Sequence, residues 1–547
     1  MFVREIKKPN GSSTIAIVES VREGDKVIQK VIRMLGTHKD VREIAIVKEA
    51  GNRLIVEMLD AKDPVLLGFD PADFHKVKTR PKKDLATQLS VEGLEHTGLV
   101  TVGVQEVFGP LFNEMGFGEV IRGTNKDTEW TSNLEKLVLS RIEDPVSKLN
   151  TSENLERDHE VILPVQKLYR TMDKVSDFEE VIKEKIRLST LTTLDQKINV
   201  MFYDVTTLYF ESFKPDDLRH QGFSKDCKFK ETQVVLALAT TTEGLPLTYE
   251  IFPGNTSEGK TLITVIEKMK NKYGAEKVMV VADRAMFTEL NLFTLDSLGV
   301  EYIVAAKLKG LPKEFKEQIL NYKKGQSSDI KLWHHEIEFK ERRLIVSYSE
   351  DRRSKDEHDR KKLVDRLLKK VNGKTIPVSQ LITNHGTKKY INIKSGSVTI
   401  NEEKIEKDKL WDGLHGVITN KNNPREVEEI LQTYRGLWQI EAAFRVTKTD
   451  IKIRPVYHWK ESRIRAHIAI CFMAYALLVQ IRYRLNRQGV NLSVRKIKEE
   501  LSRIVKVKIR NKHSKTEVIL PAKLNDVQRS IYNALKITPE INKATVL

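Results

Sequence analysis

The sequence predicts an α/β fold, and the main evidence is the order of its strands and helices from about residue 198. A short apolar strand over 198–203 ends at Asp204. Two further apolar strands, over 233–240 and 245–252, flank a Glu-Gly pair that is typical of a hairpin turn. We therefore expect the first three strands to form a meander.

Helix and strand alternate after this meander. Apolar residues recur at helical spacing over 258–272, and an apolar strand over 277–282 leads into Asp283. A second helix over 287–298 and a last strand over 300–308 follow. This β-β-β-α-β-α-β order is that of the ribonuclease-H-like fold, by analogy of topology. The sequence therefore predicts a ribonuclease-H-like core.

The rest of the chain is organised around that core. At about 100–200 residues per domain, 547 residues suggest three or four units. Near the N-terminus, apolar segments on either side of a Glu-Gly-Asp turn predict a hairpin. The expected parts are an N-terminal β region over 1–75, a helical region over 76–195, the first part of the core over 196–310, an inserted and mainly β subdomain over 311–420, the second part of the core over 421–490 and a basic C-terminal region over 491–547. A final helical stretch is expected over 461–488, before the basic region.

Composition narrows the possible functions. The formal net charge is +17, and a basic surface favours polyanions, with nucleic acid first. Two cysteines, Cys227 and Cys471, cannot supply a disulfide scaffold or a cysteine-type zinc cluster, so we expect a reducing compartment. The longest apolar run, over 468–481, is too short to span a bilayer and predicts a buried helix. We expect a cytoplasmic protein without a membrane partner.

Two aspartates suggest a site at one edge of the predicted sheet. Asp204 and Asp283 each follow an apolar strand, and the carboxyl ends of such strands meet where ligands tend to bind. Carboxylate oxygens are the ligands that Mg²⁺ prefers, and two metal ions can assist both sides of a phosphoryl transfer. Taken singly, each aspartate could equally well end its strand and cap the next turn.

A third carboxylate, Glu441, lies on a helix expected over 425–447. Tyr434, Glu441 and Lys448 are each seven residues apart, so they drift by only about 20° per step around the helix. Arg445 follows one turn after Glu441. An acid between an aromatic ring and two cations suits a metal ligand flanked by phosphate contacts. The alternative is an exposed helix face on which Glu441 and Arg445 form an ordinary pair.

Together these residues resemble the DDE transposases of bacterial insertion sequences, over roughly residues 198–480. The match rests on several ordered motifs, which are more specific together than any one of them. They are DVTTLYF at 204–210, FPGNTSE at 252–258, VADRA at 281–285, the Tyr434, Glu441 and Lys448 series with QIEAAFR at 439–445, and RIRAHI at 463–468.

The resemblance implies a DNA transposase that cuts strands at transposon ends and transfers them into target DNA. It implies that Asp204, Asp283 and Glu441 hold two Mg²⁺ ions, for which Mn²⁺ could substitute. It further implies that the double-stranded ends are held by a homodimer assembled on DNA, that 76–195 help to recognise the ends, and that the protein is bacterial and associates with the nucleoid when bound. The DNA contacts it implies come from Tyr434, Arg445 and Lys448.

The sequence departs from the family pattern at one position. The signature usually has an arginine three residues after the tyrosine, where this chain has Leu437. Arg435 or Arg445 could replace the phosphate contact that this arginine would make. Members of this branch can form hairpin-ended DNA, which needs an extruded base stacked on an aromatic ring. Trp333 lies in the insertion, where a buried strand residue is the simpler interpretation.

Other function classes remain open from the sequence alone. Residues 254–261 fit the G-x-x-x-x-G-K-[ST] pattern of a P-loop NTPase, between a strand and a helix. Against this, the preceding strand is expected to be the return arm of a hairpin, and Glu258 would place a carboxylate among phosphates. A non-catalytic DNA-binding descendant of a transposase, or a nuclease that cuts without strand transfer, would carry much the same motifs. His334 and His335 are expected to face opposite sides of a strand and not to share a metal.

Overall fold

The computed structural model describes most of the chain in two compact units, Met1–Ser90 and Val91–Leu547. The division lies somewhat later than the boundary expected at residue 75. Cys227 and the turn at Gly24 and Asp25 lie outside the described residues. The described residues are 2–9, 12–23, 26–38, 40–60, 93–121, 127–195, 198–222, 230–273, 279–286, 288–327, 329–371, 387–394, 397–512, 516–520, 522–538 and 545–546.

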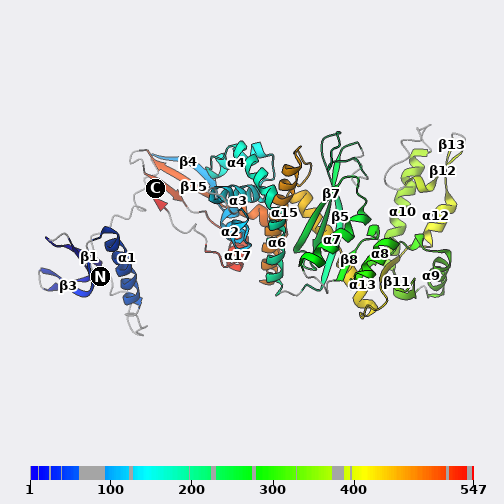
Figure 1. Ribbon diagram of the computed structural model, residues 1–547, viewed down its shortest axis with the longest axis horizontal. Helices are drawn as coiled ribbons and strands as arrows, with labels where there is room; N and C mark the ends of the chain where they lie inside the picture. Colours follow the sequence, from blue (N-terminus) through cyan, green and yellow to red (C-terminus); the bar gives the residue numbers. More distant parts are fainter. Residues whose placement is uncertain are drawn as a thin grey trace. The chain divides into compact units, whose positions relative to one another are not determined.

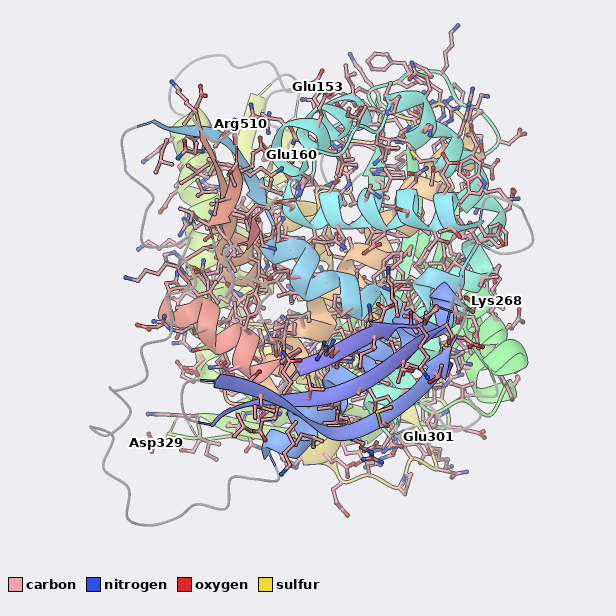
Figure 2. The ribbon with its side chains drawn as sticks, turned by 90° about the vertical axis from the view of Figure 1, so that its left-hand side faces the viewer. Glu153, Glu160, Lys268, Glu301, Asp329 and Arg510 are labelled. Carbon is pink, nitrogen blue, oxygen red and sulfur yellow. The ribbon has the colours of Figure 1, made fainter. Side chains whose placement is uncertain are left out.

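The N-terminal unit combines a three-stranded sheet with one helix. Strands β1 (Phe2–Lys7), β2 (Ser13–Glu23) and β3 (Lys26–His38) pair antiparallel in that order and lie side by side in Figure 2. The expected hairpin is present. Part of the region 1–75 is not β, however, because residues 41–60 form the helix α1 (Val41–Asp60). Ile44, Gly51 and Ile55 recur at helical spacing, a period that the β interpretation overlooked.

The larger unit is built on a mixed eight-stranded sheet. Strands β5 (Val200–Tyr209), β6 (Gln233–Thr240) and β7 (Pro246–Pro253) form the antiparallel meander, and β8 (Met279–Ala282) and β9 (Tyr302–Ala305) run parallel to β5. This half of the sheet has the order β9-β8-β5-β6-β7, and Figure 1 labels β5, β7 and β8 in it. Helix α7 (Glu258–Tyr273) joins β7 to β8, and α8 (Glu289–Ser297) joins β8 to β9. The predicted ribonuclease-H-like order is confirmed.

The segment 311–420 is mixed in composition, where a largely β subdomain was expected. Three of its strands extend the central sheet in the order β10-β11-β14. Strand β14 pairs with β9, which would otherwise be an exposed edge. The segment also contains helices, and the charged stretch after β11 forms the longest of those described. The elements are α9 (Lys313–Gly325), β10 (Leu332–Glu338), β11 (Arg342–Ser349), α10 (Glu350–Val371), β12 (Ile391–Lys394), β13 (Ser397–Ile400), α12 (Glu402–Lys409) and β14 (Leu414–Asn420).

A helical bundle packs beside the sheet and is centred on α15 (Glu461–Arg487). Among the described residues, α15 is the one helix long and apolar enough to cross a membrane, and 94% of its most apolar window is buried inside the protein. The expected buried helix is confirmed, although it is longer than the apolar run suggested. Its partners are α2 (Gly103–Glu114), α3 (Asp127–Glu143), α5 (Val165–Val175) and α6 (Glu179–Thr193), with α4 (Lys148–His159) against α5.

The C-terminal region forms a small sheet with the start of this unit. Strand β15 (Val505–Asn511) pairs with β4 (Leu94–Thr101) and with β16 (Glu517–Leu520), which pairs with β17 (Thr545–Val546). Helices α16 (Val494–Leu501) and α17 (Asp526–Ala534) pack against α15 and against each other. Several basic side chains of this region already have acidic partners: Lys508 pairs with Glu160, and Arg510, labelled with Glu160 in Figure 2, pairs with Glu517.

Two histidines, His467 in α15 and His458 shortly before this helix, lead to a pH prediction. Burial lowers the pKa of His458 to about 4 and that of His467 well below its ordinary value, with Arg141 adding to both effects. His467 Nε2 lies 3.0 Å from the carbonyl oxygen of Ile453, so the neutral ring is held in place. Between about pH 6.5 and pH 4 the unfolded chain therefore binds more protons than the folded one. The contribution of these histidines to folding stability is therefore fully present above this window and is lost as pH falls through it.

We expect the free energy of unfolding, measured by urea titration, to fall between about pH 7 and pH 4.5, with His458 contributing on the order of 2 kcal/mol of the loss. His458→Gln, which cannot titrate, should show a smaller loss over the same window than the wild-type protein does. An identical pH slope for both proteins would contradict the assignment of the effect to this ring.

Candidate active site

The pairing of β5 with β8 brings the two predicted aspartates together. Tyr203 of β5 lies opposite Ala282 of β8 in a parallel register, so Asp204 and Asp283 occupy the next positions on neighbouring strands. Asp283 directly follows β8, as predicted. Asp204 does not end its strand, because β5 continues to Tyr209 and pairs with β6 along that extension. The parallel partner stops at this level, and the edge predicted for the two carboxylates is therefore present.

Alternation along the strands places these carboxylates on one face of the sheet. Phe202 and Val281 belong to the core that packs α14, whereas Tyr203 and Ala282 belong to the core on the other face. Asp204 is in phase with Phe202 and therefore points toward the face covered by α14. Asp283 lines one cavity together with Tyr434, a residue that packs against the same core as Phe202.

Glu441 lies on a helix that is interrupted where a single helix over 425–447 was expected. Helix α13 (Val427–Arg435) ends at Gly436, α14 (Trp438–Arg445) follows, and a π-helical turn occupies Val446–Asp450. The N–H of Leu437 donates to the carbonyl oxygen of Tyr434 over 3.0 Å, a tightened 3₁₀ connection. A Cβ on Gly436 would lie 2.7 Å from Cζ of Phe202, so the break lets the chain pass close to β5.

The interruption separates the residues that the regular spacing had aligned. Tyr434 and Glu441 still line one cavity of about 600 Å³. Lys448 lies in the π-helical turn, with its ammonium 5.5 Å from the ring centre of Phe444. Arg445 lines a different cavity. The tightened and widened turns change the angle per residue, which the assumption of a regular helix could not include.

Two neighbouring cavities are lined by two of the three predicted acids, Asp283 and Glu441, while Asp204 lines neither. The Glu441 cavity, of about 600 Å³, and the Asp283 cavity, of about 520 Å³, share three lining residues. These shared residues are Arg352 from α10, His415 from β14 and Tyr434 from α13. Asp283 and Glu441 therefore lie on either side of one shared wall. The Asp283 cavity is also basic, with Arg284, Lys307 and Lys309 among its lining residues.

The aromatic part of the shared wall is uncharged near neutral pH. The rings of His415 and Tyr434 are 4.9 Å apart between centroids. Burial lowers the pKa of His415 to about 4, and the positive charge of Arg352 adds to this. Burial likewise raises the pKa of Tyr434. The only formal charge in the wall near pH 7 is therefore that of Arg352.

A third, basic cavity of about 890 Å³ adjoins the Glu441 cavity, since Trp438 lines both. Its wall comes from α14, the π-helical turn, α15 and α16. Five cations, offset by three carboxylates, line it: Arg445, Lys452, Arg482, Arg495 and Lys498. Arg445 thus lies in a basic groove next to the acidic residues and not among them.

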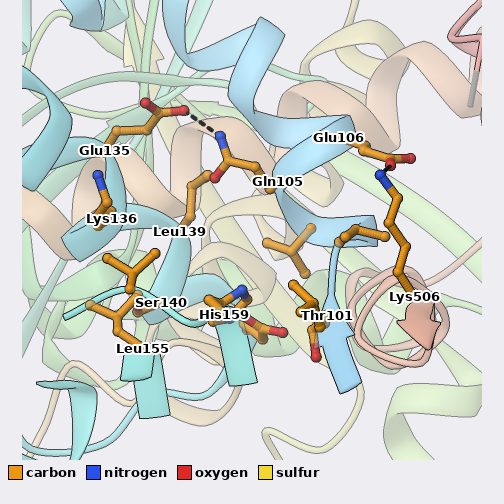
Figure 3. A pocket seen from close by; sticks show the side chains of 15 residues that line it. Thr101, Gln105, Glu106, Glu135, Lys136, Leu139, Ser140, Leu155, His159 and Lys506 are labelled. Atoms are coloured by element: carbon orange, nitrogen blue, oxygen red, sulfur yellow. Dashed lines mark hydrogen bonds and ion pairs between the residues drawn. The ribbon is translucent and has the colours of Figure 1, made fainter. Parts of the chain in front are cut away.

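A smaller cavity, of about 310 Å³, lies between β4 and helices α2, α3 and α4 (Figure 3). Its polar groups are largely paired with one another. Gln105 donates to Glu135 over 2.8 Å, and Lys506 lies 3.5 Å from Glu106. No residue of the predicted site lines it, and we assign it no part in the chemistry.

The three predicted acids have the oxygen atoms that a metal ion prefers, but they are not grouped as a metal site. Three carboxylates offer the oxygen ligands that hard divalent cations prefer. Within the described ranges, however, no three His, Cys, Asp or Glu side chains are grouped closely enough to hold a metal ion as they stand. The aspartates occupy neighbouring positions in the sheet, whereas Glu441 lines the adjoining cavity.

Sequence analysis missed two residues of the shared wall. Arg352 falls in a run of mixed charges that predicts only a solvated helix, and His415 is an isolated histidine in a strand. Neither has a local signal, because each reaches the site through the pairing of β11 and β14 with the central sheet. A search of the sequence for cations near the predicted sheet edge would not have found Arg352, because its place there depends on this long-range strand pairing.

The P-loop pattern at 254–261 is not used as a phosphate cradle. Strand β7 before it is an antiparallel edge strand, not a buried parallel one. The hydroxyl of Thr261 is buried, accepts from the hydroxyl of Tyr203 over 2.6 Å and donates to the carbonyl oxygen of Glu258. A Cβ on Gly254 would lie 2.0 Å from the carbonyl oxygen of Gln233, so this glycine permits close packing of backbones.

Comparison with known proteins identifies the class. A family model described as "Transposase DDE domain" matches residues 161–477, more than half of the chain. The chain belongs to this family: it is a DDE transposase, an enzyme that acts on DNA by phosphoryl transfer. Transposases of this family use divalent metal ions. No curated protein is similar enough to count as a match.

Similar solved structures are also transposases. The chain is 7% identical to the piggyBac transposase in a synaptic complex with hairpin DNA, covering 73% of this chain and 76% of that one with a TM-score of 0.41. It is 14% identical to the Mos1 transposase in a paired-end complex with the left transposon end, covering 33% and 61% with a TM-score of 0.15. It is 14% identical to the protein in a Mos1 mariner paired-end complex with Mn, covering 36% of this chain and 72% of that one with a TM-score of 0.14.

Proposed function

We propose that this transposase cuts DNA strands at the ends of its own element and joins the freed ends to target DNA, with Asp204, Asp283 and Glu441 as its metal-binding residues. The observation that carries the proposal is the parallel register of β5 and β8, which sets two carboxylates side by side facing α14. Glu441 lines the cavity that shares a wall with that of Asp283.

The carboxylates would hold two Mg²⁺ ions, or Mn²⁺ in their place, and the metal supplies activation of the attacking oxygen and stabilisation of the leaving one. The chain's own residues bind and orient the DNA for in-line transfer, because positioning and charge stabilisation dominate phosphoryl transfer. The proposal requires Glu441 to approach the aspartate pair when DNA and metal are bound, since the three are not yet grouped.

The surrounding cations would hold the DNA backbone. Arg445 and the basic cavity lie beside the Glu441 cavity, where a strand leaving the site would pass. Tyr434 lies in the wall between the acidic residues, and Lys448 follows on the π-helical turn. We propose that Tyr434, Arg445 and Lys448 contact DNA near the cut. Two ends must be joined in one event, so we also propose a homodimer assembled on DNA. We further propose that it acts on the chromosome in the cytoplasm of a bacterium.

The test is a cleavage assay on DNA from the repeats that flank the gene. Wild-type protein is incubated with this DNA and Mg²⁺, without nucleotide, and the products are mapped on both strands. We expect cuts at the repeat boundary that vanish when EDTA removes the metal. Binding without cuts, from folded protein with either Mg²⁺ or Mn²⁺, would favour a non-catalytic descendant. Cuts that require ATP would overturn the proposal.

A further inference from the structure

Arg352 is placed where a single phosphate could be held between the two acidic cavities. It lies in the first turn of α10, directly after β11, and is the one Lys or Arg side chain among the described residues that lines both the Asp283 and the Glu441 cavities. We propose that Arg352 binds a backbone phosphate of the DNA strand being cut. This inference rests on the proposed function, because it assumes that the strand passes between Asp283 and Glu441.

The guanidinium of Arg352 has no partner of its own within the described part of the chain: it makes no hydrogen bond or ion pair there. The neighbouring Arg353 pairs with Glu350 and with Glu357, the latter over 2.9 Å. Arg360, two turns further along α10, pairs with Asp412. Arg353 and Arg360 are thus neutralised by acidic partners, whereas the exposed Arg352 lies beside two uncharged rings.

The other nearby cations are less suited to this role. Three cations, Arg284, Lys307 and Lys309, line the Asp283 cavity but not the Glu441 cavity, and Lys309 also pairs with Asp408 over 3.0 Å. Arg435 lines only the Glu441 cavity and lies 3.7 Å from Glu428. Arg445, the other substitute that the sequence offered, lines the basic cavity instead. Arg352 is therefore the cation placed to reach a group lying between the carboxylates.

An arginine suits this contact on chemical grounds. Its planar guanidinium matches two oxygens of a phosphate at once and keeps its charge at any pH that the fold tolerates. A phosphate near two or three carboxylates is repelled by them, so a fixed positive charge in the same wall lowers the cost of bringing it there. The contact would act on the position of the strand, and we expect its loss to affect cleavage more than overall affinity.

The experiment combines Arg352→Ala and Arg352→Lys with end-containing DNA in which one phosphate at a time near the cut is replaced by an uncharged methylphosphonate. Arg353→Ala is the matched control, since it removes an adjacent arginine that already has partners. Single-turnover cleavage and DNA affinity are measured for each combination. We expect Arg352→Ala to cleave roughly 10- to 100-fold more slowly, with Arg352→Lys in between.

The methylphosphonate series identifies the contact itself. At one linkage, the neutral substitution should slow cleavage by the wild-type and Arg353→Ala proteins. It should leave the cleavage rate of the Arg352→Ala protein unchanged. If Arg352→Ala cleaves at the wild-type rate, or remains sensitive at every linkage, the inference is wrong while the proposed function stands. If the wild-type protein binds DNA but does not cut it, DNA affinity is compared across the same series. A methylphosphonate that weakens DNA binding by the wild-type protein but not by the Arg352→Ala protein still supports the contact, and only the proposed function fails.

Discussion

Replacing Asp204, Asp283 or Glu441 by its amide is expected to slow DNA cleavage by at least about 1,000-fold, or about 4 kcal/mol of barrier, while leaving DNA affinity within about threefold. Each amide keeps the size of the side chain and removes its charge, so the packing around β5, β8 and α14 is preserved. The loss is large because a metal ion held by the remaining carboxylates would be misplaced or absent. Removal of a negative charge beside DNA gives no reason for weaker binding.

Two control variants separate this effect from general damage. Glu429→Gln removes an exposed acid of α13 that pairs with Arg425, and it should cut at the wild-type rate. Lys260→Ala changes the lysine of the P-loop pattern and should also be silent, whereas a nucleotide-driven enzyme would lose its activity. If Glu441→Gln cuts at the wild-type rate in the same assay, Glu441 is not the third ligand.

The core was predictable because its signals are local. Apolar strands, Gly-containing turns and helical spacing between residues 198 and 308 gave the strand order that the sheet confirms. The sheet beyond β9 was not predictable in the same way. Strands β10, β11 and β14 join it through pairing across more than a hundred residues, and nothing in a strand's own sequence states which edge it will cover.

The candidate site divides along the same line. Asp204, Asp283 and Glu441 stand in recognisable motifs, and the sequence could single them out. The interruption at Gly436 was overlooked because glycine within an otherwise periodic helix is tolerated at about 1 kcal/mol, so period alone did not reveal the break. Arg352 and His415 come to the site by the long-range pairing of β11 and β14 with the sheet, and only the folded arrangement reveals them.

The second large effect is expected from Gly436→Ala, because this glycine sets how closely α14 approaches β5. The new Cβ would lie 2.7 Å from Cζ and 3.4 Å from Cε2 of Phe202, a ring that is only 1% exposed and has no free direction in which to move. We expect α14 to shift and the free energy of unfolding, measured by urea titration, to fall by about 1–3 kcal/mol. Cleavage should fall roughly 100-fold, since Glu441 moves with α14, while DNA affinity changes little.

A second substitution tests whether contact with Phe202 is the cause. In the double variant Phe202→Leu, Gly436→Ala, the shorter side chain removes the ring atoms that the new Cβ meets, so α14 can return toward β5. Phe202→Leu alone should lose some stability by leaving space in the core. If the two changes act through this contact, the double variant will be more stable and more active than the sum of the single losses predicts. Simple addition of the two losses would show that Gly436 acts through the helix connection itself, and that the position of Glu441 does not depend on the ring of Phe202.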